Sequence, residues 1–153
     1  MLQLLCFKRL QKILGKIPNI NAGGCGVSAY AMYLYLKKHG CLNDFQVILL
    51  DEYFTKDEHK QNLAFVEGKS SKSNGAAHIA VTFDGGKTIQ DAKGVVDDTF
   101  EYTLLVPSHK TEAYFNALFT TKVRWNSAFN MHESIPVIEK KLGIKLGINL
   151  DII

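Results

Sequence analysis

A sharp turn in the middle of the chain constrains the fold more than any other feature of the sequence. Asp84-Gly85-Gly86 separates two strand-like runs, residues 77–83 and 87–92. Asp-Gly and Gly-Gly steps supply the positive φ values that tight hairpin turns require. The sequence therefore predicts an antiparallel hairpin, which brings side chains from the two runs onto shared faces.

Apolar periodicity predicts helices on both sides of this hairpin. An amphipathic helix is expected at the N-terminus with Leu2, Leu5, Leu10, Ile13, Leu14 and Ile17 on its apolar face, ending near Gly15 because Pro18 cannot continue it. Further helices are expected over 27–38, 111–121 and 134–142. His39-Gly40 is expected to close the helix over 27–38. Ser134 is expected to cap the helix over 134–142, with Pro136 in its first turn. Strands are expected over 46–50 and 100–106, and residues 55–67 are ambiguous between helix and loop. Helices, then an antiparallel meander, then helices predict one α+β domain over residues 1–153.

Charge and cysteine content narrow the functional classes. The net charge is only +3 and the basic residues are scattered, which argues against a nucleic-acid partner. The apolar N-terminal stretch is interrupted by lysine and arginine, so no stable membrane insertion is expected. Three cysteines without a CxxC pair predict neither a metal site nor a secreted disulfide framework. We therefore expect a protein located in the cytoplasm or inside a host cell. His39 and Cys41 flank the glycine that ends a helix and are expected to cap the helix rather than bind a metal. His59 lies in a polar segment and is expected to have no matching partner.

Cys25 is the first candidate for chemistry. It stands where a glycine-rich turn, 21–26, meets the start of a predicted helix. The unpaired N–H groups and the positive dipole end of a helix N-terminus favour an anion, and the thiolate is the reactive form of cysteine. Gly23 and Gly24 would let a substrate approach the Cys25 N–H, a donor for an oxyanion. The alternative is a buried cysteine that serves as a small apolar side chain.

His78 and Asp91 favour the catalytic interpretation. His78 opens the first strand of the hairpin on the face of the small residue Ala80. A loop at Gly85-Gly86 would place Asp91 opposite Ala80 and diagonal to His78, whereas a loop at Asp84-Gly85 would pair Asp91 with His78 directly. Either register predicts a carboxylate–imidazole hydrogen bond, which fixes the tautomer and stabilises the imidazolium. A three-residue loop would instead turn Asp91 to the opposite face, because side chains alternate with period two. The alternative is a histidine at a solvent-exposed strand edge beside an ordinary turn aspartate.

These segments resemble the papain-like cysteine peptidase superfamily, and in particular small cysteine-protease-like proteins of bacteriophages and bacteria. The resemblance lies in the Gly-Gly-Cys25-Gly helix start, the strand opened by His78 and Asp91 on the next strand. The tail segments 124–126, 129–130 and 135–139 are also similar, so that the resemblance spans most of residues 19–142. It implies a papain-like fold, in which the nucleophile begins a helix packed on an antiparallel sheet.

The resemblance also implies an amide side chain shortly before the nucleophile, aimed at the oxyanion. Asn19 and Asn21 are the candidates, and spacing slightly favours Asn19, although asparagine is equally common in turns. The predicted catalytic residues are Cys25, His78 and Asp91, and the predicted oxyanion and substrate-binding residues are Asn19, Asn21, Gly23 and Gly24.

The predicted function is hydrolysis of an amide or isopeptide bond in a peptide or protein substrate, without a cofactor. Transglutaminases, arylamine acetyltransferases and cell-wall amidopeptidases share the Cys, His, Asp order and also form a thioester, so acyl transfer to an amine is an alternative. Another alternative is a catalytically silent papain-like phage protein that acts by binding a host component.

Overall fold

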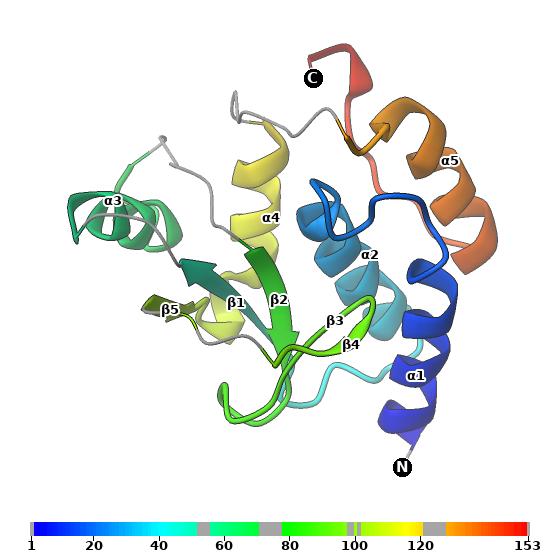
Figure 1. Ribbon diagram of the computed structural model, residues 1–153, viewed down its shortest axis with the longest axis horizontal. Coiled ribbons are helices and arrows are strands. Elements are labelled where there is room, and N and C mark those ends of the chain that lie inside the picture. Colours follow the sequence, from blue (N-terminus) through cyan, green and yellow to red (C-terminus); the bar gives the residue numbers. More distant parts are fainter. Residues whose placement is uncertain are drawn as a thin grey trace.

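A computed structural model describes residues 2–51, 56–70, 78–97, 100, 102–120 and 128–152. Its helices are α1 (Leu2–Leu14), α2 (Cys25–Lys38), α3 (Lys56–Val66), α4 (Thr111–Thr120) and α5 (Met131–Leu142). Its strands are β1 (Gln46–Asp51), β2 (His78–Thr82), β3 (Ile89–Asp91), β4 (Gly94–Val95) and β5 (Tyr102–Leu105). These elements confirm the predicted α+β class and identify the ambiguous segment before the hairpin as a helix, α3 (Figure 1).

The strands form one antiparallel sheet with the order β4-β3-β2-β1-β5. The predicted meander is confirmed for the β2–β3 hairpin, but the strand that follows β3 in the sheet is β4, which was not predicted, and not the strand predicted over 100–106. The chain then returns to the far side of β1, where β5 becomes the opposite edge strand. Turn residues indicate which consecutive strands form hairpins, but they carry no information about where a later strand joins the sheet.

The hairpin has one of the two predicted registers. Thr82 lies opposite Ile89, as expected for a loop centred on Gly85-Gly86. The loop is wider than two residues because β2 ends at Thr82 and β3 begins at Ile89. The buried Thr82 hydroxyl accepts a hydrogen bond from the Gly86 N–H at 2.9 Å, which organises the wider loop around a side chain. In this register Asp91 is level with Ala80, two residues along the strand from His78 and on the same face.

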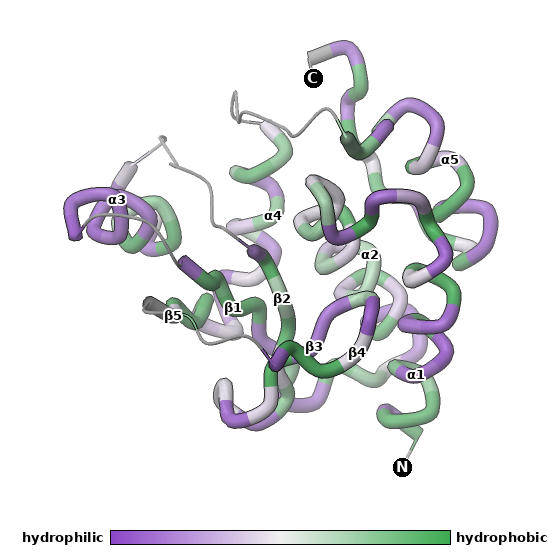
Figure 2. Tube along the Cα trace, in the orientation of Figure 1, coloured by the Kyte–Doolittle hydropathy of each residue, from purple (hydrophilic) through white to green (hydrophobic). Residues whose placement is uncertain are grey.

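The helix α2 is the centre of the core. It runs between the sheet and the pair α1 and α5, while α4 packs against it through the rings of Tyr30 and Phe115, whose centroids are 4.8 Å apart (Figure 1). Ile79 and Val81 of β2 join the large cluster around α2, whereas Ala80 joins a smaller cluster on the other face of the sheet. Figure 2 shows hydrophobic residues along β1 and β2 and hydrophilic ones on the outer turns of α3 and α5. The sheet is therefore covered by apolar side chains on both faces.

The N-terminal helix differs in part from the prediction. It ends at Leu14, before Gly15, as expected, but Leu2 and Leu5 are 66% and 64% exposed. Phe7 is buried in their place because its ring meets the edge of Phe83, with a centroid distance of 4.9 Å. No helix in the described part of the chain is long and apolar enough to cross a membrane.

The last helix begins one turn earlier than predicted. Ser134 lies inside α5, and Asn130 is the residue that caps it. Asn130 Oδ1 accepts from the Glu133 N–H at 3.1 Å, and the Asn130 amide donates back to the Glu133 carboxylate at 3.3 Å. This reciprocal cap was readable in the sequence as Asn-x-x-Glu. Ser134 was predicted as the cap because Pro136 was expected in the first turn, but Pro136 lies beyond the first turn of α5.

Candidate active site

Cys25 is the first residue of α2, as the glycine-rich turn predicts. Gly24 occupies the N-cap position and offers no side-chain acceptor to the first turn. The N–H groups of Cys25, Gly26 and Val27 belong to the first turn, where an α-helix supplies no backbone acceptor. Cys25 itself is only partly buried. A partly exposed thiol thus lies among N–H donors that have no acceptor within the helix, at the positive end of the helix dipole.

Gly24 is required by packing inside the protein. A β-carbon at this position would lie 2.7 Å from the Ile20 carbonyl oxygen and 2.7 Å from the ring of Phe129. We had expected Gly24 to admit a substrate, but here the close approach is made by the chain itself. Gly23 differs, because its φ of 108° lies in a region that side chains disfavour. Together the two glycines place the start of α2 against Phe129.

His78 and Asp91 form the predicted hydrogen bond. His78 Nε2 lies 2.9 Å from Asp91 Oδ2, and each side chain is 13% exposed. Asp91 Oδ1 accepts from the Lys93 N–H at 2.8 Å. The carboxylate is therefore held on both oxygens, which fixes its orientation toward the imidazole.

The charge on His78 reflects its neighbours. Burial by itself would lower the pKa of His78, but hydrogen bonds to Asp91 and Cys25, and the charges of these two groups, raise that pKa to about 9. For Asp91, burial acts upward, yet the hydrogen bonds from His78 and the Lys93 N–H bring its pKa below the usual range. The contact with Asp91 thus favours a protonated His78 beside an ionised carboxylate.

The Cys25 thiol lies within hydrogen-bonding reach of the His78 ring. Because Nε2 is occupied by Asp91, Nδ1 is the ring nitrogen left for the thiol. Figure 1 shows how this contact arises, since α2 and β2 begin at the same end of the molecule and pack side by side. The structure therefore brings all three predicted catalytic residues together.

Asn19 and Asn21, the two candidates for binding the oxyanion, have different partners. The contacts of neither side chain identify it as an oxyanion donor. Asn19 adopts a positive φ of 57° and donates from Nδ2 to the Ala128 carbonyl oxygen at 2.8 Å, in an exposed position. Asn21 instead hydrogen bonds to Asp91 and helps to lower the pKa of that carboxyl group. The slight preference for Asn19 was based on spacing alone, whereas the geometry makes Asn21 a neighbour of Asp91.

Gln11 of α1 is a supporting residue that sequence reasoning missed. Its Nε2 donates to the Asp91 backbone carbonyl at 2.9 Å and lies 3.3 Å from the Gln90 side chain. α1 therefore holds the end of β3 that carries Asp91. Gln11 gave no local signal, because its role depends on the packing of a distant helix.

A second carboxylate–imidazole pair lies at the end of β1. The completely buried Asp51 carboxylate is 3.3 Å from His59 Nδ1, which corrects our expectation that His59 has no partner. Its other oxygen, Oδ1, is buried and accepts no hydrogen bond from the residues that the structure describes. Tyr114 of α4 is electrostatically linked to both sites, since burial and then the charges of Cys25 and Asp51 raise its pKa. An aspartate directly after an apolar strand was the only sequence signal for this pair.

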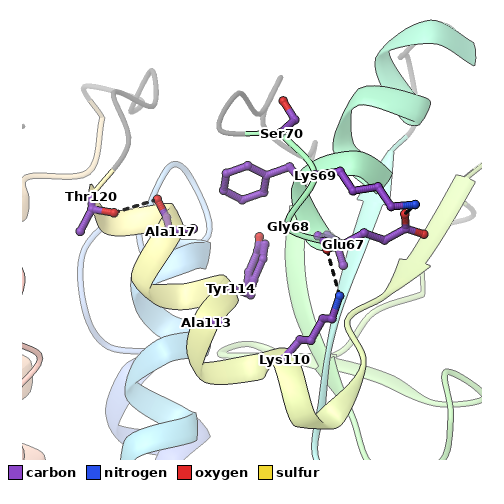
Figure 3. A pocket seen from close by; sticks show the side chains of 11 residues that line it. Glu67, Gly68, Lys69, Ser70, Lys110, Ala113, Tyr114, Ala117 and Thr120 are labelled. Carbon is purple, nitrogen blue, oxygen red and sulfur yellow. Dashed lines mark hydrogen bonds and ion pairs between the residues drawn. The ribbon is translucent and has the colours of Figure 1, made fainter.

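Tyr114 also lines a pocket of about 590 Å³ between α3 and α4. Figure 3 shows its ring pointing into the space between the two helices. The apolar part of the lining comes from Phe65, Val66, Ala113, Tyr114 and Ala117. At the rim, Lys69 is 2.9 Å from the Glu67 carboxylate, and Lys110 donates to the Glu67 carbonyl at 2.9 Å. The pocket is thus an apolar recess with basic side chains at its edge.

Comparisons with known proteins do not assign the chain to a family. No family model matches it, and no curated protein or solved structure matches it either. Part of the predicted resemblance, residues 124–126, lies outside the described residues. Within the described ranges, no group of three or more His, Cys, Asp or Glu side chains is placed to hold a metal ion. The functional argument therefore rests on the geometry around Cys25.

Proposed function

We propose that the protein is a papain-like cysteine hydrolase that cleaves an amide or isopeptide bond. The observation that carries this proposal is the chain of contacts from the Cys25 thiol, at the uncapped start of α2, to His78 and on to Asp91. A helix that begins with the nucleophile and packs on an antiparallel sheet carrying the other two residues supports the papain-like part of the proposal.

In the first step, Cys25 Sγ attacks the substrate carbonyl carbon as a thiolate, while His78 holds the proton. The developing oxyanion is bound by the Cys25 N–H at the positive end of α2. The His78 imidazolium then protonates the leaving amine, and the C–N bond breaks. The acyl group remains on Cys25 as a thioester.

In the second step, His78 removes a proton from water, which attacks the thioester. The Cys25 thiolate leaves, and the carboxylic acid product is released. Asp91 stabilises the imidazolium in both steps and keeps Nε2 occupied, so that Nδ1 exchanges the proton. Asn21 acts as a positioning residue for Asp91.

The pocket between α3 and α4 supplies a place for a substrate side chain. Its apolar lining favours an apolar side chain, and Tyr114 connects it electrostatically to Cys25. The substrate class is thus a peptide or protein that carries an apolar side chain for this pocket. We place the enzyme in the cytoplasm, because the three cysteines are free thiols and such thiols persist in a reducing compartment.

The contact between Cys25 and His78 favours a hydrolase over a silent binding protein, for which the two residues would lie apart. The acyl acceptor is a separate question, since water and a primary amine attack the same thioester. Incubation with a glutamine peptide and a labelled amine separates these acceptors, because label enters the peptide only in acyl transfer.

The decisive experiment combines thiol labelling with a substrate panel. At pH 6, an electrophilic probe should label Cys25 faster than Cys6 or Cys41, and the His78→Ala variant should lose this preference. In a panel of peptide, ubiquitin-like and muropeptide substrates, at least one should be cleaved by the wild-type protein and not by Cys25→Ala. Circular dichroism should confirm that the variant keeps its fold. Equal labelling of the three thiols, or turnover by Cys25→Ala, would exclude the mechanism.

A further inference from the structure

The other two cysteines lie side by side, at the contact between α1 and the turn that follows α2. Cys41 Sγ is 3.8 Å from Cys6 Sγ and 3.3 Å from the His39 carbonyl oxygen. Both residues are free thiols, separated by 35 positions in the chain. Cys41 is buried and Cys6 is partly exposed. The packing of α1 on α2, rather than sequence spacing, creates this pair.

The backbone around the pair is held in place without help from the sulfur atoms. Beyond the left-handed Gly40 (φ 67°), the Cys41 N–H donates to the Leu36 carbonyl at 2.8 Å and closes the end of α2. From the first turn of α1, Gln3 Nε2 donates to the Cys41 carbonyl at 2.9 Å. The two thiols are therefore kept close by two independent sets of hydrogen bonds.

We propose that Cys6 and Cys41 form an oxidisable dithiol, a modification site whose disulfide cross-links α1 to the turn after α2. The sulfur atoms need to approach from 3.8 Å to the about 2.05 Å of a disulfide bond. We expect rotation of the two side chains about their Cα–Cβ bonds to supply this movement. The hydrogen bonds from Gln3 Nε2 to the Cys41 carbonyl and from the Cys41 N–H to the Leu36 carbonyl do not involve the sulfur atoms, so we expect both to persist in the cross-linked state.

A small disulfide such as oxidised glutathione is the oxidant. The Cys6 thiolate attacks one of its sulfur atoms, which forms a mixed disulfide and releases one glutathione thiolate. Cys41 then loses its proton and attacks the Cys6 sulfur, releasing the second glutathione. Two protein thiols are oxidised, one glutathione disulfide is reduced to two thiols, and the two protein protons pass to the products. Cys6 reacts first because it is partly exposed, whereas Cys41 is buried, and burial also raises the pKa of the Cys41 thiol.

Cys25 is outside this pair. It begins α2, whereas Cys41 follows the end of the same helix, and the 14 residues of α2 span about 21 Å. A disulfide between Cys6 and Cys41 therefore leaves the proposed nucleophile free. The inference does not depend on the proposed function, and either can fail without the other.

The cross-link has a consequence for the site through α1. The same helix that carries Cys6 also carries Gln11, which binds the Asp91 backbone. A disulfide that fastens α1 to the body removes conformational freedom from the unfolded chain and opposes the detachment of this helix. We expect the oxidised protein to be more stable, with Cys25 still reactive.

The test is equilibration of the full-length protein in glutathione buffers of increasing oxidised fraction, followed by alkylation and mass spectrometry. The wild-type protein and Cys25→Ala should both form a Cys6–Cys41 disulfide, and the melting temperature should rise by roughly 10 °C. The Cys6→Ser variant should form no intramolecular disulfide and show no such rise. Cys41→Ala, which removes the buried thiol of the pair, is a second control for the loss of the intramolecular disulfide.

Three results would overturn the proposal. One is a mixed disulfide that persists on Cys6 of the wild-type protein without conversion. Another is a disulfide that includes Cys25. The third is a Cys6–Cys41 bond that forms only in unfolded protein, seen as equal oxidation with and without urea and no change in melting temperature. Loss of substrate turnover has no bearing on these outcomes, because Cys25→Ala is inactive in the proposed function and still forms the disulfide.

Discussion

His78 Nε2 and Asp91 Oδ2 are 2.9 Å apart, although the two residues are 13 positions apart in the chain and begin and end different strands. The hairpin register places the carboxylate next to the imidazole, and the Lys93 N–H orients it. This relationship makes His78 a stronger base than a free imidazole. It is also the source of the pH dependence that we expect.

Activity should decline at alkaline pH. The pKa of His78 is raised to about 9, so the imidazolium that protonates the leaving amine is lost as the pH rises through that value. Asp91→Asn removes one cause of the raised pKa and should move the alkaline limb of kcat/KM to lower pH. We also expect a fall in kcat of roughly 10²- to 10⁴-fold. An unchanged alkaline limb would contradict the role of Asp91, and Asp97→Asn in an exposed loop is the matched control.

Stability should fall over the same pH range. A raised pKa means that protonated His78 stabilises the folded state, so this contribution is full below the reference value of 6.5 and is lost as the pH rises through about 9. The two values correspond to as much as about 3 kcal/mol in the free energy of unfolding. Urea denaturation between pH 6 and pH 9.5 measures this change in the free energy of unfolding. His78→Asn should flatten the curve, whereas His109→Gln, at an exposed position, should not.

Substitutions of Asn21 and Asn19 should have different effects, the first on catalysis and the second on stability. Asn21→Ala removes a hydrogen bond to the Asp91 carboxylate, so we expect kcat to fall by roughly 10-fold with an earlier alkaline limb. Asn19→Ala removes the bond to Ala128 and should lower stability by about 1 kcal/mol with little effect on kcat. Steady-state kinetics and urea denaturation of both variants test this. The reverse result would return the oxyanion role to Asn19.

Gly24→Ala should impair both stability and catalysis. The new β-carbon would lie 2.7 Å from both the Ile20 carbonyl and the Phe129 ring, which should cost about 1–3 kcal/mol of stability and displace Cys25. Gly40→Ala is the matched control: it has a φ of 67° and no atom within 4 Å of the added carbon. We expect it to lower stability and leave kcat unchanged. Equal kinetic effects of the two variants would argue against a specific role for Gly24 at the site.

The pocket between α3 and α4 should control substrate choice. Ala113 is an exposed residue of α4 that lines the pocket, so Ala113→Phe fills the recess without disturbing the core. We expect KM to rise by roughly 10-fold or more for substrates with a large apolar side chain, while kcat for small substrates is retained. Asn116→Phe places the same ring on α4 outside the pocket lining. If both variants behave alike, the recess does not receive substrate.

The sequence by itself determined the local parts of the site. Asp84-Gly85-Gly86 specified a hairpin and, within two alternatives, its register, since turn geometry acts over a few residues. The glycine-rich turn likewise specified the start of α2 at Cys25. These features follow from backbone conformations that neighbouring residues set among themselves.

Only the tertiary structure decided which distant groups meet. The packing of the helices on the sheet brings Cys25 to His78 and buries Phe7. It also places Asn21, rather than Asn19, beside Asp91. The Asp51–His59 and Cys6–Cys41 pairs have the same origin. Such contacts are made by the side-chain packing of the whole core, so no spacing in the sequence encodes them.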